Sequence, residues 1–240
     1  MKRALRLILT VSVIFFFAGT ASAFDENDLV AVVYNENDIE VVINLGDISG
    51  IKFTASNVQL AGTGSVNLSQ FGQGIGWDNL SLGIFGGTQT GGSGSEWHAW
   101  FATTKATISG ISTSKLTNFM SGIASVYTYW GDGNTFSGSA KAVNSYDMKL
   151  NSGSNAPGSY AGVNNTDTAY GEADLAALNS AGYVDMYLYH YKWADLDKGN
   201  DVNTDYTAVI RFFLDGSIKL NPRDTKAKPM PWLQLLLEDN

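Results

Sequence analysis

The clearest pattern of apolar and polar positions lies between Tyr183 and Trp193, where two kinds of side chain alternate from one residue to the next. Val184, Met186 and Leu188 occupy one set of alternate positions, and tyrosines and polar residues occupy the other. A period of two residues is typical of a β-strand whose two faces meet different surroundings. The pattern therefore predicts one long strand over residues 183–193.

A second strand pattern, Thr207 to Leu214, ends at the dipeptide Asp215-Gly216, and a further stretch, Ser217 to Leu220, follows directly. Asp-Gly between two apolar runs favours a two-residue hairpin turn, because both central positions of that turn need positive φ. Such a turn would place Phe213 opposite Ile218. We expect these two stretches to form an antiparallel hairpin.

The rest of the chain combines further strand patterns with two helical ones. Residues 29–34 and 39–45 are largely apolar and are separated by four polar residues that favour a turn. Residues 114–127 carry apolar side chains at helical spacing, with Ser114 as the expected N-cap. A second, shorter helix is expected over residues 172–181, ended by Gly182.

Turn-forming and aromatic residues are both abundant, with 26 glycines against 4 prolines and with 11 Tyr, 12 Phe and 6 Trp. This composition is typical of short strands joined by tight turns. We therefore expect a mainly β protein, a single-domain antiparallel β-sandwich of jelly-roll type with one or two short α-helices at its flank. The domain is expected to cover residues 24–221, followed by a tail over residues 222–240.

The first 23 residues have the three parts of a secretory signal peptide. A basic start is followed by an apolar stretch, Leu7 to Ala18, and by small residues that include Ala21 and Ala23. This order predicts export and cleavage after Ala23, because Ala-x-Ala is the pattern that signal peptidase reads. The alternative is a membrane anchor, but a spanning helix needs about 20 apolar residues and the stretch from Leu7 to Ala18 is shorter. We expect the protein to be secreted, outside the cell or in the cell envelope.

The mature chain would be strongly acidic. Without the three basic residues of the signal, 12 basic and 23 acidic residues remain, a net charge of −11. Such a surface repels phosphate backbones, which argues against nucleic acid as a partner. The chain has no cysteine, which excludes a thiol nucleophile and a thiolate metal site. No apolar run downstream of the signal is long enough for a stable membrane span.

The most suggestive set of side chains is aromatic. Rings aligned on an exposed strand face can stack on sugar rings, and the same rings can instead line a core. If exposed, they would form a binding platform for polysaccharide. The candidate platform consists of Tyr187, Tyr189, Tyr191, Trp193, Trp97 and Trp100.

Four aspartates lie between the last two long strand patterns and offer oxygen ligands for calcium. They are Asp195, Asp197, Asp201 and Asp205. Their loop lacks the closing glutamate of a helix-loop-helix calcium site, so a solvated acidic loop is the main expectation. A weak calcium site is the alternative.

The only histidines, His98 and His190, each lie inside a strand pattern, and neither has a second histidine at metal-ligand spacing. We expect each histidine to lie on the surface, or in the core with its hydrogen bonds satisfied. Glu96, Glu172 and several aspartates are candidates for the carboxylate pair of a glycosidase. Such pairs arise by chance in an acidic chain, so we expect no catalytic residue and no cofactor.

The C-terminal tail has a distinct order of proline, apolar and acidic residues. Pro229-x-Pro231 precedes the apolar stretch Trp232 to Leu237, and the last three residues are Glu, Asp and Asn. Together with the signal and the cysteine-free, Gly- and Asn-rich body, this resembles exported bacterial proteins of the PEP-CTERM sorting type. The sorting tail is truncated or degenerate, since the apolar stretch is short and the end is acidic where that family has a basic end. The resemblance implies a destination in the envelope or extracellular matrix of Gram-negative, exopolysaccharide-producing bacteria.

Three functional hypotheses follow. The first is a non-catalytic secreted surface or extracellular-matrix protein that contacts polysaccharide, or another surface protein, through an aromatic strand face. The second is a polysaccharide-active hydrolase of jelly-roll type, which would show exposed carboxylates clustered in a groove. The third is a structural subunit of an extracellular assembly, which would show an unpaired edge strand or a large apolar patch.

Overall fold

The computed structural model describes residues 24, 27–35, 39–62, 66–89, 97–108, 112–131, 133, 135–150, 171–194 and 206–222. The expected signal peptide, the acidic loop with Asp195, Asp197, Asp201 and Asp205, and the tail beyond Pro222 therefore lie outside the described residues. Among the helices that are described, none is both long enough and apolar enough to cross a membrane.

Strands dominate the described part of the chain, and only one helix is longer than two turns. The strands are β1 (Asp28–Tyr34), β2 (Ile39–Asp47), β3 (Val58–Gln59), β4 (Ser81–Gln89), β5 (Trp97–Thr103), β6 (Thr135–Ser139), β7 (Ala173–Asp174), β8 (Tyr183–Lys192), β9 (Ala208–Phe213) and β10 (Ile218–Leu220). The helices are α1 (Thr113–Trp130), α2 (Tyr146–Lys149) and α4 (Ala177–Ala181), with short 3-10 turns η1 (Ile48–Gly50), η2 (Leu68–Phe71) and η3 (Trp77–Asn79).

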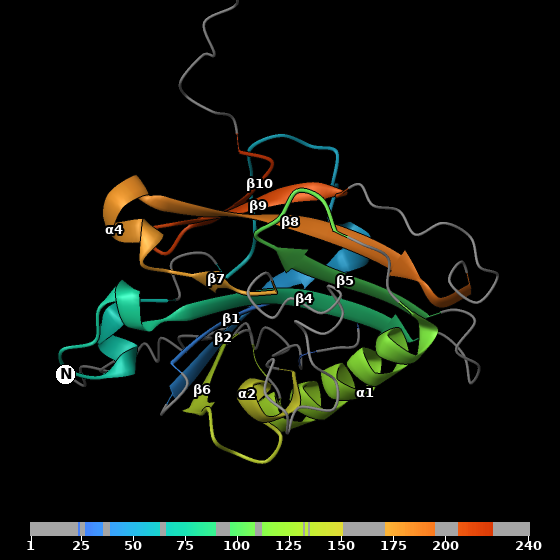
Figure 1. Ribbon diagram of the computed structural model, residues 1–240, viewed down its shortest axis with the longest axis horizontal. Coiled ribbons are helices and arrows are strands. Elements are labelled where there is room, and N and C mark those ends of the chain that lie inside the picture. The colour runs from blue at the N-terminus through green and yellow to red at the C-terminus, as the bar shows by residue number, and fades with distance from the viewer. Residues whose placement is uncertain are drawn as a thin grey trace, which may run out of the picture.

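These strands form one antiparallel sheet in the order β3-β10-β9-β8-β5-β4-β1-β2-β6, with β7 paired to the start of β4. The sheet curls strongly into a half-barrel (Figure 1), in keeping with the natural twist of neighbouring strands. The expected mainly β, antiparallel class is confirmed. A sandwich of two separate sheets is not confirmed, because the hydrogen-bonded pairing runs without a break from β3 to β6.

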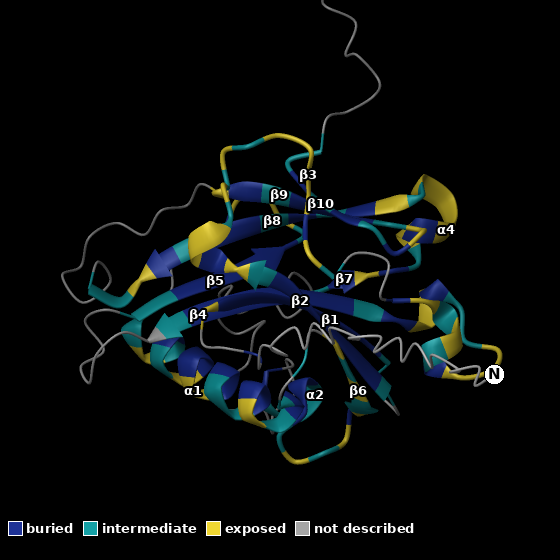
Figure 2. Cartoon of the chain, turned by 180° about the vertical axis from the view of Figure 1, so that it is seen from behind, coloured by how far each residue is buried: buried dark blue, intermediate teal, exposed yellow. Residues whose placement is uncertain are grey.

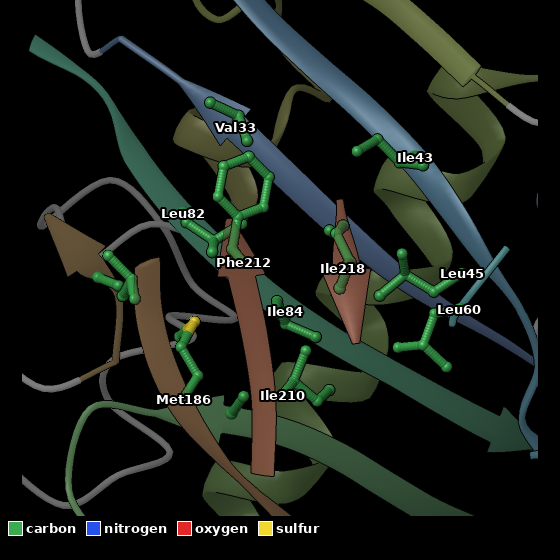
Figure 3. Packing of buried hydrophobic residues seen from close by; sticks show 14 of the residues in the cluster. Val33, Ile43, Leu45, Leu60, Leu82, Ile84, Met186, Ile210, Phe212 and Ile218 are labelled. Carbon is green, nitrogen blue, oxygen red and sulfur yellow. The ribbon is translucent and has the colours of Figure 1, made fainter. Parts of the chain in front are cut away.

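The concave side of the sheet encloses the first of two apolar cores. Phe212 and Ile218, from β9 and β10, point toward Val33 and Ile43 on β1 and β2 (Figure 3). In β8, even-numbered residues such as Met186 face this core. Because burial of one large apolar side chain contributes roughly 1.5–3 kcal/mol, this core ties the two ends of the strand order together.

The convex side carries the second core, which α1 covers. Phe119 of α1 meets Phe85 of β4 and Phe101 of β5, each with ring centroids 6.1 Å apart. Odd-numbered residues of β8, such as Tyr189, belong to this core. The central strands are therefore buried on both faces (Figure 2), which explains why residues 29–34 and 41–43 are apolar without a break.

The long helix is confirmed, with corrected ends. It runs from Thr113 to Trp130, and its N-cap is Ser112, whose Oγ accepts a hydrogen bond from the backbone N–H of Lys115 at 3.3 Å. Ser114, the expected cap, lies inside the first turn. Two serines two residues apart are both suitable caps by type, and only the backbone of the folded chain selects between them.

The second helix is shorter than the expected span of residues 172–181. Ala173 pairs with Leu82 as part of β7, so this segment begins as a strand. The Asp174 carboxylate then accepts a hydrogen bond from the backbone N–H of Ala176 at 2.8 Å, and α4 follows. The helix ends at Gly182 with φ of 78°, and this predicted end is confirmed.

The hairpin between β9 and β10 differs from the prediction by one residue. Phe212, and not Phe213, stands opposite Ile218. The loop has three residues, because the Phe213 N–H donates to the Ser217 carbonyl and the Gly216 N–H donates to the Phe213 carbonyl, both at 2.9 Å. Gly216 has φ of 77°, as a three-residue hairpin with a left-handed last position requires. The shift moves Phe213 to the opposite face of the sheet.

Candidate functional site

The aromatic residues of the expected platform do not share one exposed surface. Tyr189 and Tyr191 are 0% and 3% exposed and lie in the core beneath α1. The Tyr191 ring stacks on Phe101 with centroids 5.3 Å apart, and burial raises the pKa of its phenol. The alternation of β8 correctly puts these tyrosines on one face. That face is covered by a helix, so Tyr189 and Tyr191 offer no ring to a sugar.

The other four residues of the expected platform are divided between the two faces. Trp97, Trp193 and Tyr187 are partly buried and pack against the edge of the core beneath α1. Trp100 is 7% exposed and lies on the concave side. These positions correct the sequence-based hypothesis, since only Tyr187 lies where the convex face continues onto β9.

A different group of side chains comes together on the convex face of β8, β9 and β10. Cross-strand pairing sets Tyr183 opposite Phe213, and Asp185 opposite Arg211, so each pair shares one face. We call this group the aromatic–charged face. Its members are Tyr183, Asp185 and Tyr187 of β8, Arg211 and Phe213 of β9, Lys219 of β10, and Tyr206, which precedes β9.

The centre of this face is a rigid ion pair. The Arg211 guanidinium donates through Nε to Asp185 Oδ1 at 2.6 Å and through Nη2 to Oδ2 at 2.7 Å. Its Cζ lies 3.7 Å from the centroid of the Tyr183 ring. A planar, two-point contact of this kind fixes both partners in orientation. The Asp185 side chain is 29% exposed, whereas that of Arg211 is 10% exposed.

Aromatic rings flank the ion pair on both sides along the strands. The Tyr183 and Phe213 rings lie 6.4 Å apart between centroids. On the other side, Tyr187 meets Tyr206 at 4.9 Å. Tyr183 is 37% exposed and Tyr206 is 43% exposed, and no other aromatic ring among the described residues is classed as exposed. Solvent therefore reaches aromatic surface on either side of the charged pair.

A row of polar side chains crosses the sheet at the level of the ion pair. Arg211 stands opposite Lys219 of β10, which in turn stands opposite Gln59 of β3. The Lys219 ammonium lies 5.4 Å from the centroid of the Phe213 ring, within the range of a cation–π contact. Rings that can stack on sugar C–H faces therefore lie beside charged and amide groups that can bind hydroxyl or carboxylate oxygens.

Glu40 of β2 is a second unusual carboxyl, and it is fully buried. Its two oxygens accept hydrogen bonds from Trp130 Nε1 at 2.9 Å and from the backbone N–H of Tyr146 at 2.8 Å. Burial raises the pKa of the Glu40 carboxyl to about 7, and the two hydrogen bonds offset part of that rise. Because no part of the side chain is exposed, Glu40 joins β2 to α1 and α2 and does not meet a ligand.

Glu172, one of the two carboxylates considered for a hydrolase, is held by two phenols. Its carboxylate accepts hydrogen bonds from the hydroxyl of Tyr34 at 2.9 Å and from the hydroxyl of Tyr146. Gly83 allows this arrangement, since a Cβ there would lie 2.5 Å from the Tyr146 hydroxyl. These contacts attach the start of β7 to the sheet. The other carboxylate, Glu96, lies outside the described residues.

The two histidines form a contact that the sequence analysis did not anticipate. His98 of β5 and His190 of β8 are separated by 92 positions in the chain, yet His98 Nδ1 lies 2.9 Å from His190 Nε2. Pairing of β5 with β8 brings them together, because His190 stands opposite Trp100, two residues from His98. Spacing along the chain gives no signal for this, since it depends on which strands become neighbours.

Within the described ranges, no three His, Cys, Asp or Glu residues are grouped so that they could hold a metal ion. The calcium hypothesis rests on four aspartates that lie outside those ranges, so it stays a hypothesis. Comparison with known proteins gives no further constraint: no family model matches the chain, and no curated protein or solved structure matches it.

Proposed function

We propose that this protein is an exported, non-catalytic surface or matrix protein that binds extracellular polysaccharide with the aromatic–charged face. The signal-like start of the sequence supports export. The observation that carries the proposal is the ion pair between Arg211 and Asp185, fixed against Tyr183 and flanked by exposed rings. Sugar binding needs this combination of flat apolar surface and oriented polar groups.

The rigidity of the face supports a binding role. The side chains project from paired strands, so their positions are set before a ligand arrives. A pre-organised surface loses less conformational entropy on binding than a flexible one. The charge on the face also differs from that of the whole chain, since two cations and one carboxylate meet here in a chain of net charge −8. The face therefore accommodates neutral sugars, and Lys219 adds affinity for uronic acids.

Affinity electrophoresis tests the proposal with gels that contain dextran, xylan, soluble cellulose or alginate. We expect at least one of these polysaccharides to retard the mature protein. Tyr183→Ala and Phe213→Ala should each weaken binding by about 2- to 10-fold, the loss expected for one aromatic contact. Lys219→Ala should weaken binding to alginate more than binding to the neutral polymers.

The matched control is Tyr129→Ala. Like Tyr183, Tyr129 packs on one phenylalanine, Phe136, with centroids 5.1 Å apart, but it lies on α1, away from the aromatic–charged face. It should leave binding unchanged. Absence of retardation in all gels, or equal losses for Tyr129→Ala and Tyr183→Ala, would rule out this face as the site. Release of reducing sugars from a retarding polymer would instead favour a hydrolase.

A further inference from the structure

One nitrogen of His98 and one of His190 lie as close together as two ligands of a single metal ion. An imidazole nitrogen binds zinc at about 2.0–2.1 Å, so two such nitrogens on one ion lie about 2.9–3.4 Å apart when the angle between them is 90–110°. The distance from His98 Nδ1 to His190 Nε2 is 2.9 Å. The two nitrogens are therefore already spaced for one ion, without movement of the strands.

The surroundings hold both rings in place. The Trp100 indole stacks on the His190 ring with centroids 4.3 Å apart and an interplanar angle of 7°. The His98 ring stacks on His190 at 5.1 Å and on Trp100 at 5.7 Å. Trp100 itself is 7% exposed and belongs to the concave core, while both histidines are partly exposed. Trp100 thus holds the pair against the core, and both imidazoles keep part of their surface exposed to solvent.

We propose that His98 and His190 form a two-ligand site for a divalent transition metal such as Cu²⁺, Ni²⁺ or Zn²⁺. Imidazole suits these ions, whereas Ca²⁺ and Mg²⁺ prefer oxygen ligands. On binding, the ion takes the place of the shared proton between Nδ1 and Nε2. The ring that carried that proton then holds it on its other nitrogen. Water completes the coordination. This site is separate from the aromatic–charged face and does not depend on the proposed function.

The composition of the chain makes the proposal easy to test. The whole sequence has two histidines and no cysteine, so any imidazole-dependent metal binding must come from this pair. We expect the untagged mature protein to be retained on nickel-chelate resin. We also expect Cu²⁺ to quench part of its tryptophan fluorescence, because Trp100 stacks against the site. Trp100→Phe should reduce the quenching by Cu²⁺ but leave retention on the nickel-chelate resin unchanged.

His98→Asn and His190→Asn supply the decisive comparison, with circular dichroism as the check on folding. Each should weaken Cu²⁺ binding by about 100-fold or more in titration calorimetry, since loss of even an outer-shell partner commonly costs about 10- to 100-fold. Lys192 stands opposite His98 across the strands, so Lys192→Ala removes a nearby positive charge and should tighten binding. A wild-type protein that is not retained on nickel resin and does not bind Cu²⁺ would overturn the proposal, as would variants that bind as tightly as the wild type.

Discussion

At the scale of single residues, Glu40 behaves unlike a carboxyl group that is exposed to water. A carboxyl in this position is removed from water, which penalises its charged form and raises its pKa from 4.5 to about 7. Hydrogen bonds from Trp130 and Tyr146 stabilise the carboxylate and keep the rise from being larger. The residue is therefore neutral over a pH range in which the unfolded chain has already lost the proton.

This difference predicts a pH dependence of stability. Between about pH 4.5 and pH 7 the folded state holds a proton that the unfolded state has released, so the free energy of unfolding falls as the pH rises. The stability linked to the proton on Glu40 is fully present below pH 4.5 and is lost as the pH rises to about 7. The loss amounts to roughly 3 kcal/mol in the free energy of unfolding. Glu40→Gln keeps a neutral side chain at every pH and should remove this dependence.

Urea denaturation at several pH values isolates the effect of Glu40. The difference in unfolding free energy between the wild type and Glu40→Gln should shift in favour of the variant by roughly 3 kcal/mol from pH 4.5 to pH 8. Other carboxyl groups titrate in both proteins and largely cancel in this difference. A difference that stays constant with pH would show that Glu40 remains charged in the folded protein.

Part of the candidate site was predictable at this scale. The alternation in residues 183–193 correctly assigned Tyr187, Tyr189 and Tyr191 to one face. The alternation gave no information on which part of that face α1 would cover. Phe213 was missed because the predicted turn was one residue too short, and a slip of one residue exchanges the two faces of a strand.

At the scale of elements, sequence periodicity predicted which elements exist better than where they end. The strand over residues 183–193 and the helix over residues 114–127 both appear in the structure, as β8 and α1. Their periodic apolar positions reflect packing on a core, which extends over many residues. The sequence pattern does not separate the short elements β7 and α4 and predicts one helix there, because the two residues of β7 are too few to show a period.

The two serines at the start of α1 provide a test of the observed cap. The Ser112 side chain satisfies the N–H of Lys115, whereas the Ser114 hydroxyl lies 3.0 Å from the Ser112 Oγ. Ser112→Ala should therefore lower the free energy of unfolding by about 1 kcal/mol. Ser114→Ala, the matched control, should change it by less than about 0.5 kcal/mol. Thermal melts of the two variants decide between the caps, and the reverse order of losses would place the cap at Ser114.

At the scale of the whole molecule, the fold joins distant parts of the sequence in a way that no local pattern encodes. β5 and β8 are neighbours in the sheet although about 80 residues separate them in the chain, and this pairing alone creates the contact between His98 and His190. Curling of the sheet likewise encloses a core between strands at its two ends. The sequence supported the mainly β class, but the order of the strands depends on long-range packing.

The end of the described chain shows which residues close this fold. Asn221, with φ of 44°, exchanges backbone and side-chain hydrogen bonds with Val209, and its amide also donates to the carbonyls of Phe53 and Ala55. Its own carbonyl accepts from the N–H of Asn57 at 2.8 Å. One residue thus joins β9 to the segment that leads into β3. Asn suits the position because it tolerates a left-handed backbone better than most residues.

Two truncations that differ by two residues test this role. Removal of residues 223–240 should leave the urea midpoint unchanged, because β10 and the bonds of Asn221 remain. Removal of residues 221–240 should lower the free energy of unfolding by about 3–5 kcal/mol, since several partly buried hydrogen bonds are lost and each contributes about 0.5–1.5 kcal/mol. A large loss from the shorter deletion would mean that the tail, including Trp232, packs against the domain. Equal stability of both truncated proteins would mean that Asn221 does not close the fold.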